Sequence, residues 1–282
     1  MITIRDANFR YSKSRVVFEN LNLEMNSGHI YGLLGKNGVG KTTLLKLLTG
    51  LSIPQSGSVD LDGSTPSKRQ PDFLEGIFLV PEEISLPPVK PLTFAKINGP
   101  LYSGFDHSRF RELLKNFNVD EDQNFSKMSH GQRKKALISF AIACNTKFLF
   151  LDEPTNGLDI PSKGIFRSLL ASLFSEDRTI ILSTHQVRDL QSLIDSVVIL
   201  EDGKVVLNSS LDHVARRFAF GHSLLSPLSG EVFYQCTSEM GKSVMTPNLS
   251  ENPGNVDLET LFNACIDIPE KISSAFSLQS SN

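Results

Sequence analysis

The stretch that decides the fold is Gly35-Lys36-Asn37-Gly38-Val39-Gly40-Lys41-Thr42, which matches the pattern GxxxxGK[ST]. It follows an apolar run at residues 29–34 that is typical of a buried strand, and it precedes a helical pattern at residues 44–48 that Gly50 ends. Glycines in a strand-to-helix loop let backbone N–H groups wrap a phosphate, because no side chain blocks the approach. The N-terminal end of the following helix favours the same anion. The sequence therefore predicts a phosphate-binding loop.

Two side chains of this loop have expected roles of their own. Lys41 would reach the β- and γ-phosphates, and the Thr42 hydroxyl would ligate Mg²⁺. The alternative is a glycine-rich turn that carries a lysine by chance, which at ordinary residue usage happens in about one chain of this length in a hundred. We therefore expect the loop and the residue after it to bind the nucleotide: Gly35, Lys36, Asn37, Gly38, Val39, Gly40, Lys41, Thr42 and Thr43.

Acidic residues follow a second apolar run, at residues 148–151. A strand there, beside the loop, places Asp152 at its carboxyl edge, where ligands bind in open α/β sheets and where Mg²⁺ needs a carboxylate. Glu153 is then placed to accept a proton from an attacking water. Strands often end in acidic residues that have no such function. Asp152 and Glu153 therefore indicate a catalytic site only in combination with the phosphate-binding loop.

A third apolar run, at residues 180–183, ends just before His185. The three runs would all deliver polar residues to one edge of the sheet, where a donor on His185 would steady the γ-phosphate or the water. A single histidine at a strand end is more often a hydrogen-bonded structural residue, and this alternative stays open.

Ser129-His130-Gly131-Gln132 opens a helix, and the pattern Ser-x-x-Gln is also a capping box, in which serine and glutamine satisfy the first backbone N–H groups. A capped helix start that carries a glycine also favours an anion. The two interpretations are compatible, and the distance in sequence from Gly35 leaves open whether this helix start faces the nucleotide of its own chain.

Composition excludes several classes of protein. With 282 residues, 40% of them hydrophobic, the chain is too apolar for disorder. Its longest apolar runs, such as residues 197–200, are far shorter than the ~20 residues that cross a bilayer. Residues 1–15 show no secretory signal, so we expect a cytoplasmic protein. The three cysteines lie far apart, which argues against a disulfide framework or a thiolate metal site. A net charge of −3 without a basic stripe argues against a nucleic-acid partner.

Strands that alternate with helices predict a mainly parallel sheet covered on both faces. Residues 1–63 suggest short strands interrupted by one helix, and the prolines between residues 81 and 100 exclude long elements there and mark a connection. The segment after Leu207 is rich in serine and acidic, with a helical pattern at residues 258–265, and predicts an appended subdomain or a loosely held tail. Further strands are expected at 179–183 and 196–200, and helices at 108–117, 129–144 and 162–174.

Five motifs, taken in order, resemble the nucleotide-binding subunit of an ABC transporter. Ser-x-Gly-Gln upstream of Leu-Asp-Glu-Pro-Thr distinguishes that family from other phosphate-loop proteins, and the resemblance covers about residues 1–210. It implies an α/β P-loop NTPase (RecA-like) core with a mainly parallel sheet, an N-terminal antiparallel β subdomain and a helical subdomain inserted at about residues 88–145. Residues 211–282 are left as an acidic, serine-rich C-terminal extension. The motifs are residues 35–42, 129–132, 151–155, 157–159 and 183–185.

The resemblance implies that two such domains pair head to tail, as a homodimer or a heterodimer. ATP would lie between the phosphate loop of one domain and Ser129, Gly131 and Gln132 of the other. Tyr11 lies where the family places an aromatic ring against adenine, although a tyrosine at a strand edge is the alternative. Asp159 corresponds to the family's D-loop at the dimer interface.

Two residues depart from the family's pattern. Glu82 stands after residues 77–80 where the family usually has glutamine; its oxygens could still ligate Mg²⁺ or orient water, but it adds negative charge beside the phosphates. His130 stands where glycine is commoner, and we hypothesise that its imidazole slows closure of the dimer or makes closure sensitive to pH.

The function expected from the resemblance is that of an ATPase, with ATP and Mg²⁺ as ligands and Lys41, Glu153 and His185 as catalytic residues. Nucleotide-dependent closure of the dimer would drive a separate integral-membrane permease, and the subunit would lie on the inner face of the cell membrane through that permease. We expect export rather than import. The alternative is a regulatory domain that binds ATP without productive hydrolysis. A protein acting on ribosomes or DNA fits poorly, because the sequence has one phosphate loop and no sustained heptads.

Overall fold

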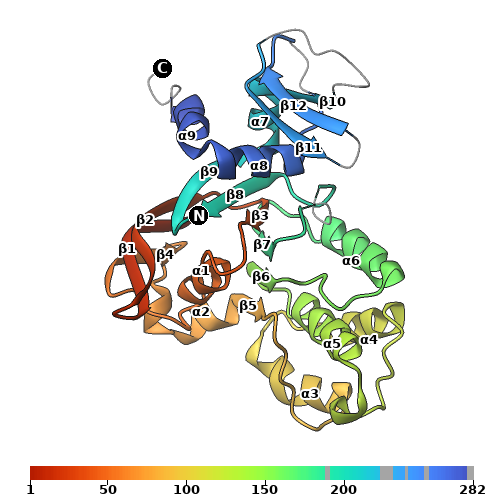
Figure 1. Ribbon diagram of the computed structural model, residues 1–282. Coiled ribbons are helices and arrows are strands. Elements are labelled where there is room, and N and C mark those ends of the chain that lie inside the picture. Colours follow the sequence, from red (N-terminus) through yellow and green to blue (C-terminus); the bar gives the residue numbers. More distant parts are fainter. Residues whose placement is uncertain (188–190, 223–230, 239–240, 251–253, 278–282) are drawn as a thin grey trace.

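The computed structural model describes residues 1–187, 191–222, 231–238, 241–250 and 254–277 (Figure 1). Its centre is a six-stranded sheet in the order β5-β6-β7-β3-β8-β9. The first five strands are parallel, and β9 runs antiparallel to β8. The expected mainly parallel sheet is therefore confirmed. Its strands are β3 (Ile30–Leu34), β5 (Ile77–Val80), β6 (Phe148–Asp152), β7 (Thr179–Thr184), β8 (Ser196–Glu201) and β9 (Lys204–Ser210).

Both faces of this sheet are buried, which explains why its strands are uninterrupted apolar runs. In β6, Leu149 and Leu151 belong to one hydrophobic core, whereas Phe148 and Phe150 belong to a second core on the other face. The alternation follows from the two-residue period of a strand. The sheet is thus held between two layers, and its carboxyl edge is left for loops.

An antiparallel sheet covers one of these faces. Its order is β2-β1-β4, built from β1 (Ile2–Ser12), β2 (Arg15–Met25) and β4 (Ser56–Leu61). The apolar side chains of these strands share a core with α1 (Lys41–Leu48) and with the central sheet. The N-terminal β subdomain is confirmed in this form. The short helices η1 (Pro66–Lys68) and α2 (Pro71–Glu75) lead from it to β5.

Three longer helices lie together at one end of the molecule in Figure 1: α3 (Pro91–Asn98), α4 (His107–Asn116) and α5 (His130–Ala143). The Phe140 ring lies 4.9 Å from the rings of both Phe94 and Phe105, so aromatic packing holds the group together. The sequence predicted only a connection where α3 forms. Proline is compatible with the first position of a helix, and Pro91 occupies that position. The short helices η2 (Gly99–Leu101) and η3 (Phe125–Lys127) flank α4.

The α6 helix (Ile160–Ser172) starts earlier than expected, because Asp159 accepts a hydrogen bond from Ser162 N and caps it.

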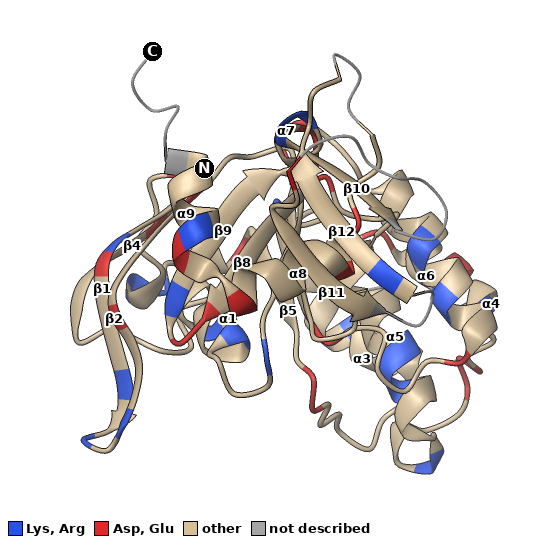
Figure 2. Cartoon of the chain, turned by 45° about the horizontal axis from the view of Figure 1, so that its top comes forward, with Lys and Arg blue, Asp and Glu red and all other residues tan. Residues whose placement is uncertain are grey.

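None of the helices within the described ranges is long and apolar enough to cross a membrane. Basic and acidic residues are interspersed over the elements in Figure 2.

The described residues after Ser210 form strands and helices, several of which contact the central sheet. Helices α8 and α9 contact β8 and β9, and a three-stranded antiparallel sheet in the order β10-β12-β11 packs on α7 and α8 (Figure 1). Only part of α8 was expected from the sequence. Ser243 and Thr246 are both 1% exposed, so polar residues at buried positions hide the strand pattern of β12. The elements are α7 (Leu211–Arg217), β10 (Phe218–His222), β11 (Tyr234–Ser238), β12 (Gly241–Pro247), α8 (Leu258–Asp267) and α9 (Pro269–Ser277).

Candidate functional site

A cavity of about 640 Å³ lies at the carboxyl edge of the central sheet. The parallel strands β3, β6 and β7 all end there, so the residues that follow them meet although they lie far apart in the chain. The cavity gathers most of the side chains that the sequence predicts for a nucleotide site. It is lined by Tyr11, Arg15, Val16, Val17, Asn37, Gly38, Gly40, Lys41, Thr42, Thr43, Lys46, Glu82, Asp152, Glu153 and His185.

The loop between β3 and α1 forms one wall of this cavity. Gly38 and Gly40 have φ angles of +82° and +115°, which L side chains rarely adopt. A Cβ atom on Gly40 would also lie 2.8 Å from the Phe18 ring. Both glycines are therefore required for the backbone to curve around the cavity. Gly40 is the N-cap of α1, so free N–H groups of the first helical turn lie beside the cavity.

Lys41 folds back across this loop. Its Nζ donates to Gly35 O at 2.7 Å and to Lys36 O at 3.2 Å, and the residue is 7% exposed. Burial lowers the pKa of Lys41, while the carboxylates of Glu153, Asp152 and Glu82 oppose that effect. The ammonium is thus held between the loop and the acidic side of the cavity.

Asp152 joins the ends of three elements. Thr42 Oγ1 donates to Asp152 Oδ2 at 2.7 Å, and Ser183 Oγ donates to Asp152 Oδ1. Asp152 is 3% exposed, so both carboxylate oxygens are fixed by hydroxyl groups. Oxygen atoms of a hydroxyl and a carboxylate suit Mg²⁺, which prefers such ligands together with substrate phosphates. Thr42 and Asp152 therefore fit a magnesium site. Glu82 lines the same cavity, but it is exposed and lies at the edge.

Glu153 is held by the residues that follow β7. Thr184 Oγ1 donates to Glu153 Oε2 at 2.9 Å, and the His185 backbone N–H donates to Oε1 at 3.0 Å. The His185 ring is also close, with Nδ1 2.8 Å from Oε1. The Glu153 side chain is only 5% exposed, so its carboxylate has a fixed orientation beside a half-exposed imidazole. The structure thus brings together Lys41, Asp152, Glu153 and His185 as the sequence predicts.

Tyr11 also lines the cavity and lies beside the first turn of α1. Its Oη lies 3.1 Å from Thr43 Oγ1, and the Arg15 guanidinium carbon lies 5.3 Å from the centre of its ring. The edge of the ring packs on Phe9, whose centroid is 5.0 Å away. Tyr11 is 47% exposed, so part of its ring is open to a ligand in the cavity.

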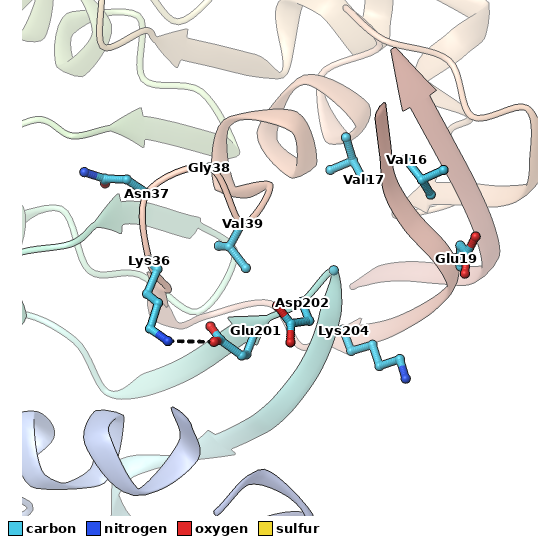
Figure 3. Close-up of a pocket in the computed structure, with 11 residues that line it drawn as sticks. Val16, Val17, Glu19, Lys36, Asn37, Gly38, Val39, Glu201, Asp202 and Lys204 are labelled. Atoms are coloured by element: carbon cyan, nitrogen blue, oxygen red, sulfur yellow. Dashed lines mark hydrogen bonds and ion pairs between the residues drawn. The ribbon is translucent and has the colours of Figure 1, made fainter. Parts of the chain in front are cut away.

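Lys36 points into a neighbouring cavity of about 490 Å³, on the side of the loop that faces the β8–β9 turn (Figure 3). Its Nζ forms an ion pair with Glu201 Oε1 at 2.8 Å. Only its backbone therefore remains available toward the first cavity. Val39 also lines this second cavity, whereas Asn37 and Gly38 border both.

Ser129 begins α5 with the expected capping box. Gln132 N donates to Ser129 Oγ at 3.2 Å, and Ser129 N donates to Gln132 Oε1 at 2.9 Å. Ser129, Gly131 and Gln132 are not among the residues that line the first cavity of this chain. Gly131 instead packs on the loop after Glu153, since a Cβ atom on it would lie 2.7 Å from Gly157 O. The His130 ring lies over Gly157 as well.

Three side chains at the site were not expected from the sequence. Arg15 covers the Tyr11 ring, and Thr184 fixes the Glu153 carboxylate. Lys134 Nζ donates to Glu153 O at 2.5 Å from a position that is 0% exposed. Thr184 could have been found from the sequence, because it lies in the motif at residues 183–185. Lys134 could not, because it lies in a run of three basic residues, and such runs are usually exposed to solvent.

Comparison with known proteins finds a matching family and several relatives. The family model described as "ABC transporter" matches residues 18–156. The chain is 30% identical over 222 residues to the ABC transporter ATP-binding protein NatA of Bacillus subtilis, covering 75% of this chain and 90% of that protein. It is 32% identical over 198 residues to the Nod factor export ATP-binding protein I of Cupriavidus metallidurans, covering 68% of this chain and 65% of that protein.

A solved structure of an ATP-binding subunit of an ABC transporter has the same fold. The TM-score is 0.69 at 23% sequence identity, and the match covers 77% of this chain and 92% of that one. The shared fold and the match to NatA over 90% of that protein point to the same family. This chain belongs to the family of ABC transporter ATP-binding proteins.

Proposed function

We propose that this protein hydrolyses ATP and that hydrolysis drives a separate membrane permease. The observation that carries the proposal is the meeting of Lys41, Thr42, Asp152, Glu153 and His185 at one cavity. Phosphoryl transfer needs positioning and charge neutralisation more than covalent chemistry from the protein. A lysine, a hydroxyl, two carboxylates and an imidazole at one place supply both.

In this proposal, the backbone of the loop and Lys41 hold the β- and γ-phosphates, and Tyr11 stacks on the adenine. Thr42, Asp152 and Glu82 would hold Mg²⁺, which neutralises phosphate charge when bound. Glu153 accepts a proton from the water that attacks the γ-phosphorus, and ADP leaves with the electrons of the broken P–O bond. The His185 ring, whose Nδ1 lies beside Glu153 Oε1, would orient the base and steady the γ-phosphate or the attacking water.

The proposal includes a head-to-tail dimer. Ser129, Gly131 and Gln132 lie outside the cavity of their own chain, although Ser129 starts a helix whose N–H groups suit an anion. A second nucleotide-binding domain, identical or closely related, would bring its own Ser129 equivalent to the γ-phosphate. ATP binding would close this dimer, and hydrolysis would open it.

The permease is the proposed partner in the membrane, and the subunit would sit against its inner face. We propose export as the direction, because the Nod factor relative is named as an export protein. The proline-rich chain that begins at Glu82 connects the cavity to α3, so movement at the nucleotide would pass to the helical part.

A phosphate-release assay on the purified protein, with and without its permease in membranes, tests this function. The proposal expects ATP- and Mg²⁺-dependent release of phosphate. A second candidate is a regulatory domain that binds ATP without productive hydrolysis, and the Glu82 carboxylate at the cavity favours it through added negative charge. Tight ATP binding without measurable phosphate release would support that candidate instead.

A further inference from the structure

Lys134 is a lysine whose charge has no access to water. It lies in the second turn of α5, is 0% exposed, and its Nζ donates to the backbone oxygen of Glu153 at 2.5 Å. Lysine is almost never fully buried unless it is paired, because removing an ammonium from water is costly. A carbonyl partner offsets only part of this cost. The position therefore calls for an explanation other than stability.

The carbonyl that Lys134 contacts belongs to a strained residue. Glu153 has a φ angle of +45°, a left-handed conformation that a residue with a Cβ rarely adopts. This conformation turns the carbonyl toward α5, while the carboxylate of the same residue faces His185 and Thr184. The backbone torsions and the direction of the carboxylate are thus linked through one residue.

Nearby carboxylates oppose part of the effect of burial on Lys134. Burial lowers the pKa of Lys134, and the carboxylates of Glu82, Glu153 and Asp152 oppose that effect. Those three carboxylates face two buried ammonium groups, on Lys41 and Lys134. Lys41 lies on the nucleotide side, and Lys134 approaches from α5, behind Glu153.

We propose that Lys134 is a positioning residue for hydrolysis, which holds the strained Glu153 backbone so that the Glu153 carboxylate keeps its direction toward the attacking water. This inference rests on the proposed ATPase function. Lys134 acts through the Glu153 carbonyl and does not touch the nucleotide. Ser129 starts the same helix, α5. The hydrogen bond from Lys134 to Glu153 O therefore links Ser129, which would contact the nucleotide bound by the partner chain, to Glu153, the base for the nucleotide bound by its own chain.

If Lys134 were purely structural, its replacement would lower the stability of the protein, whereas a positioning role predicts little change in stability. A methionine at position 134 would fill nearly the same space and would remove the desolvation cost of a buried ammonium. Glu153 O would keep a partner, since Asn156 N donates to it at 3.2 Å. We therefore expect the variant to lose turnover without losing stability.

The test compares wild type with Lys134→Met, and with Lys115→Met as the matched control that removes an exposed lysine from α4. For Lys134→Met, kcat should fall about 10- to 100-fold, as expected for a displaced catalytic group. KM, the Kd for Mg-ATP and the melting temperature should stay close to those of wild type. Lys115→Met should match wild type throughout. Lys134→Gln keeps an N–H donor and should lose less kcat than Lys134→Met.

The outcomes separate this inference from the function on which it rests. If wild type releases no phosphate, the proposed ATPase function fails. If wild type is active and Lys134→Met keeps kcat within twofold, the positioning role is wrong. A Lys134→Met protein that melts well below wild type also contradicts it, because the lysine would then be mainly structural.

Discussion

Thr42 Oγ1 donates to Asp152 Oδ2 at 2.7 Å, across 110 positions of sequence. The bond joins the first turn of α1 to the end of β6, and Ser183 fixes the other oxygen of the same carboxylate. Two of these elements, β6 and β7, are strands whose ends the sequence predicts to share an edge. Thr42 and Asp152 would help to hold Mg²⁺, which would supply positive charge beside the phosphates.

Removal of Mg²⁺ should therefore abolish turnover, and Asp152→Asn should have nearly the same effect with Mg²⁺ present. The amide keeps the size of the side chain but removes the charge that a hard cation needs. We expect phosphate release to fall at least about 100-fold, in the range of losses when charge stabilisation is removed. Titration with EDTA and then with Mg²⁺ measures the requirement. Full activity in EDTA would contradict this assignment.

Glu153→Gln should stop hydrolysis while leaving ATP bound. Loss of a general base costs about 10²- to 10⁴-fold in rate. The amide can still accept the hydrogen bond from the His185 backbone, so the fold of the site should persist. Phosphate release and size-exclusion chromatography with ATP measure turnover and a trapped dimer. Glu176→Gln, in an exposed loop, is the control. Unchanged turnover would exclude Glu153 as the base.

Gly131→Ala and Gly164→Ala should change stability in opposite directions. A Cβ atom on Gly131 would lie 2.7 Å from Gly157 O, so the start of α5 must move away from the loop after Glu153. We expect a loss of about 1–3 kcal/mol and lower turnover. Gly164 lies within α6 with open space around it, so alanine should stabilise the protein by about 0.5–1 kcal/mol. Urea denaturation measures the free energy of unfolding of both variants. Equal changes in the two variants would contradict the close contact between residue 131 and Gly157 O.

Asp159 should make part of the stability depend on acid pH. Hydrogen bonds from Ser162, and a weaker contribution from Lys135, lower the pKa of Asp159 from 3.8 to about 2. The ionised form is favoured in the folded protein, so its contribution is complete above the unfolded pKa and is lost as pH falls toward 2.

Asp159→Asn isolates this effect, because asparagine also caps helices but carries no charge. The stability difference between the two proteins should be constant from pH 7 to about 5 and should shrink between pH 4 and pH 3. Urea denaturation at these pH values measures it. A difference that does not change down to pH 3 would contradict the role of the charge.

The central sheet and the residues of the cavity could be predicted because short sequence patterns indicate them. A loop such as 35–42 permits few folds, and strands buried on both faces are apolar throughout, as Phe148 and Leu149 show. Polar residues placed directly after such strands must meet at one edge. Glu153 and His185 could therefore be paired without knowledge of the structure.

The rest depends on tertiary contacts that leave no local pattern. Lys134 looks like a surface residue because its neighbours Arg133 and Lys135 are also basic, and only the packing of α5 on the Glu153 loop buries it. Strand β12 could not be predicted, because the polar residues Ser243 and Thr246 occupy buried positions. The ion pair that draws Lys36 toward Glu201 spans 165 positions.

The most direct test of the account is a mixing experiment with two inactive variants, Lys41→Met and Ser129→Arg. Each alone would disable both nucleotide sites of a symmetric dimer. A mixed head-to-tail dimer would keep one site intact, built from the wild-type loop of one chain and the wild-type Ser129 of the other. Random mixing should restore about a quarter of wild-type phosphate release, since half of the dimers are mixed and each has one good site. No recovery in dimers shown to be mixed would contradict a shared site.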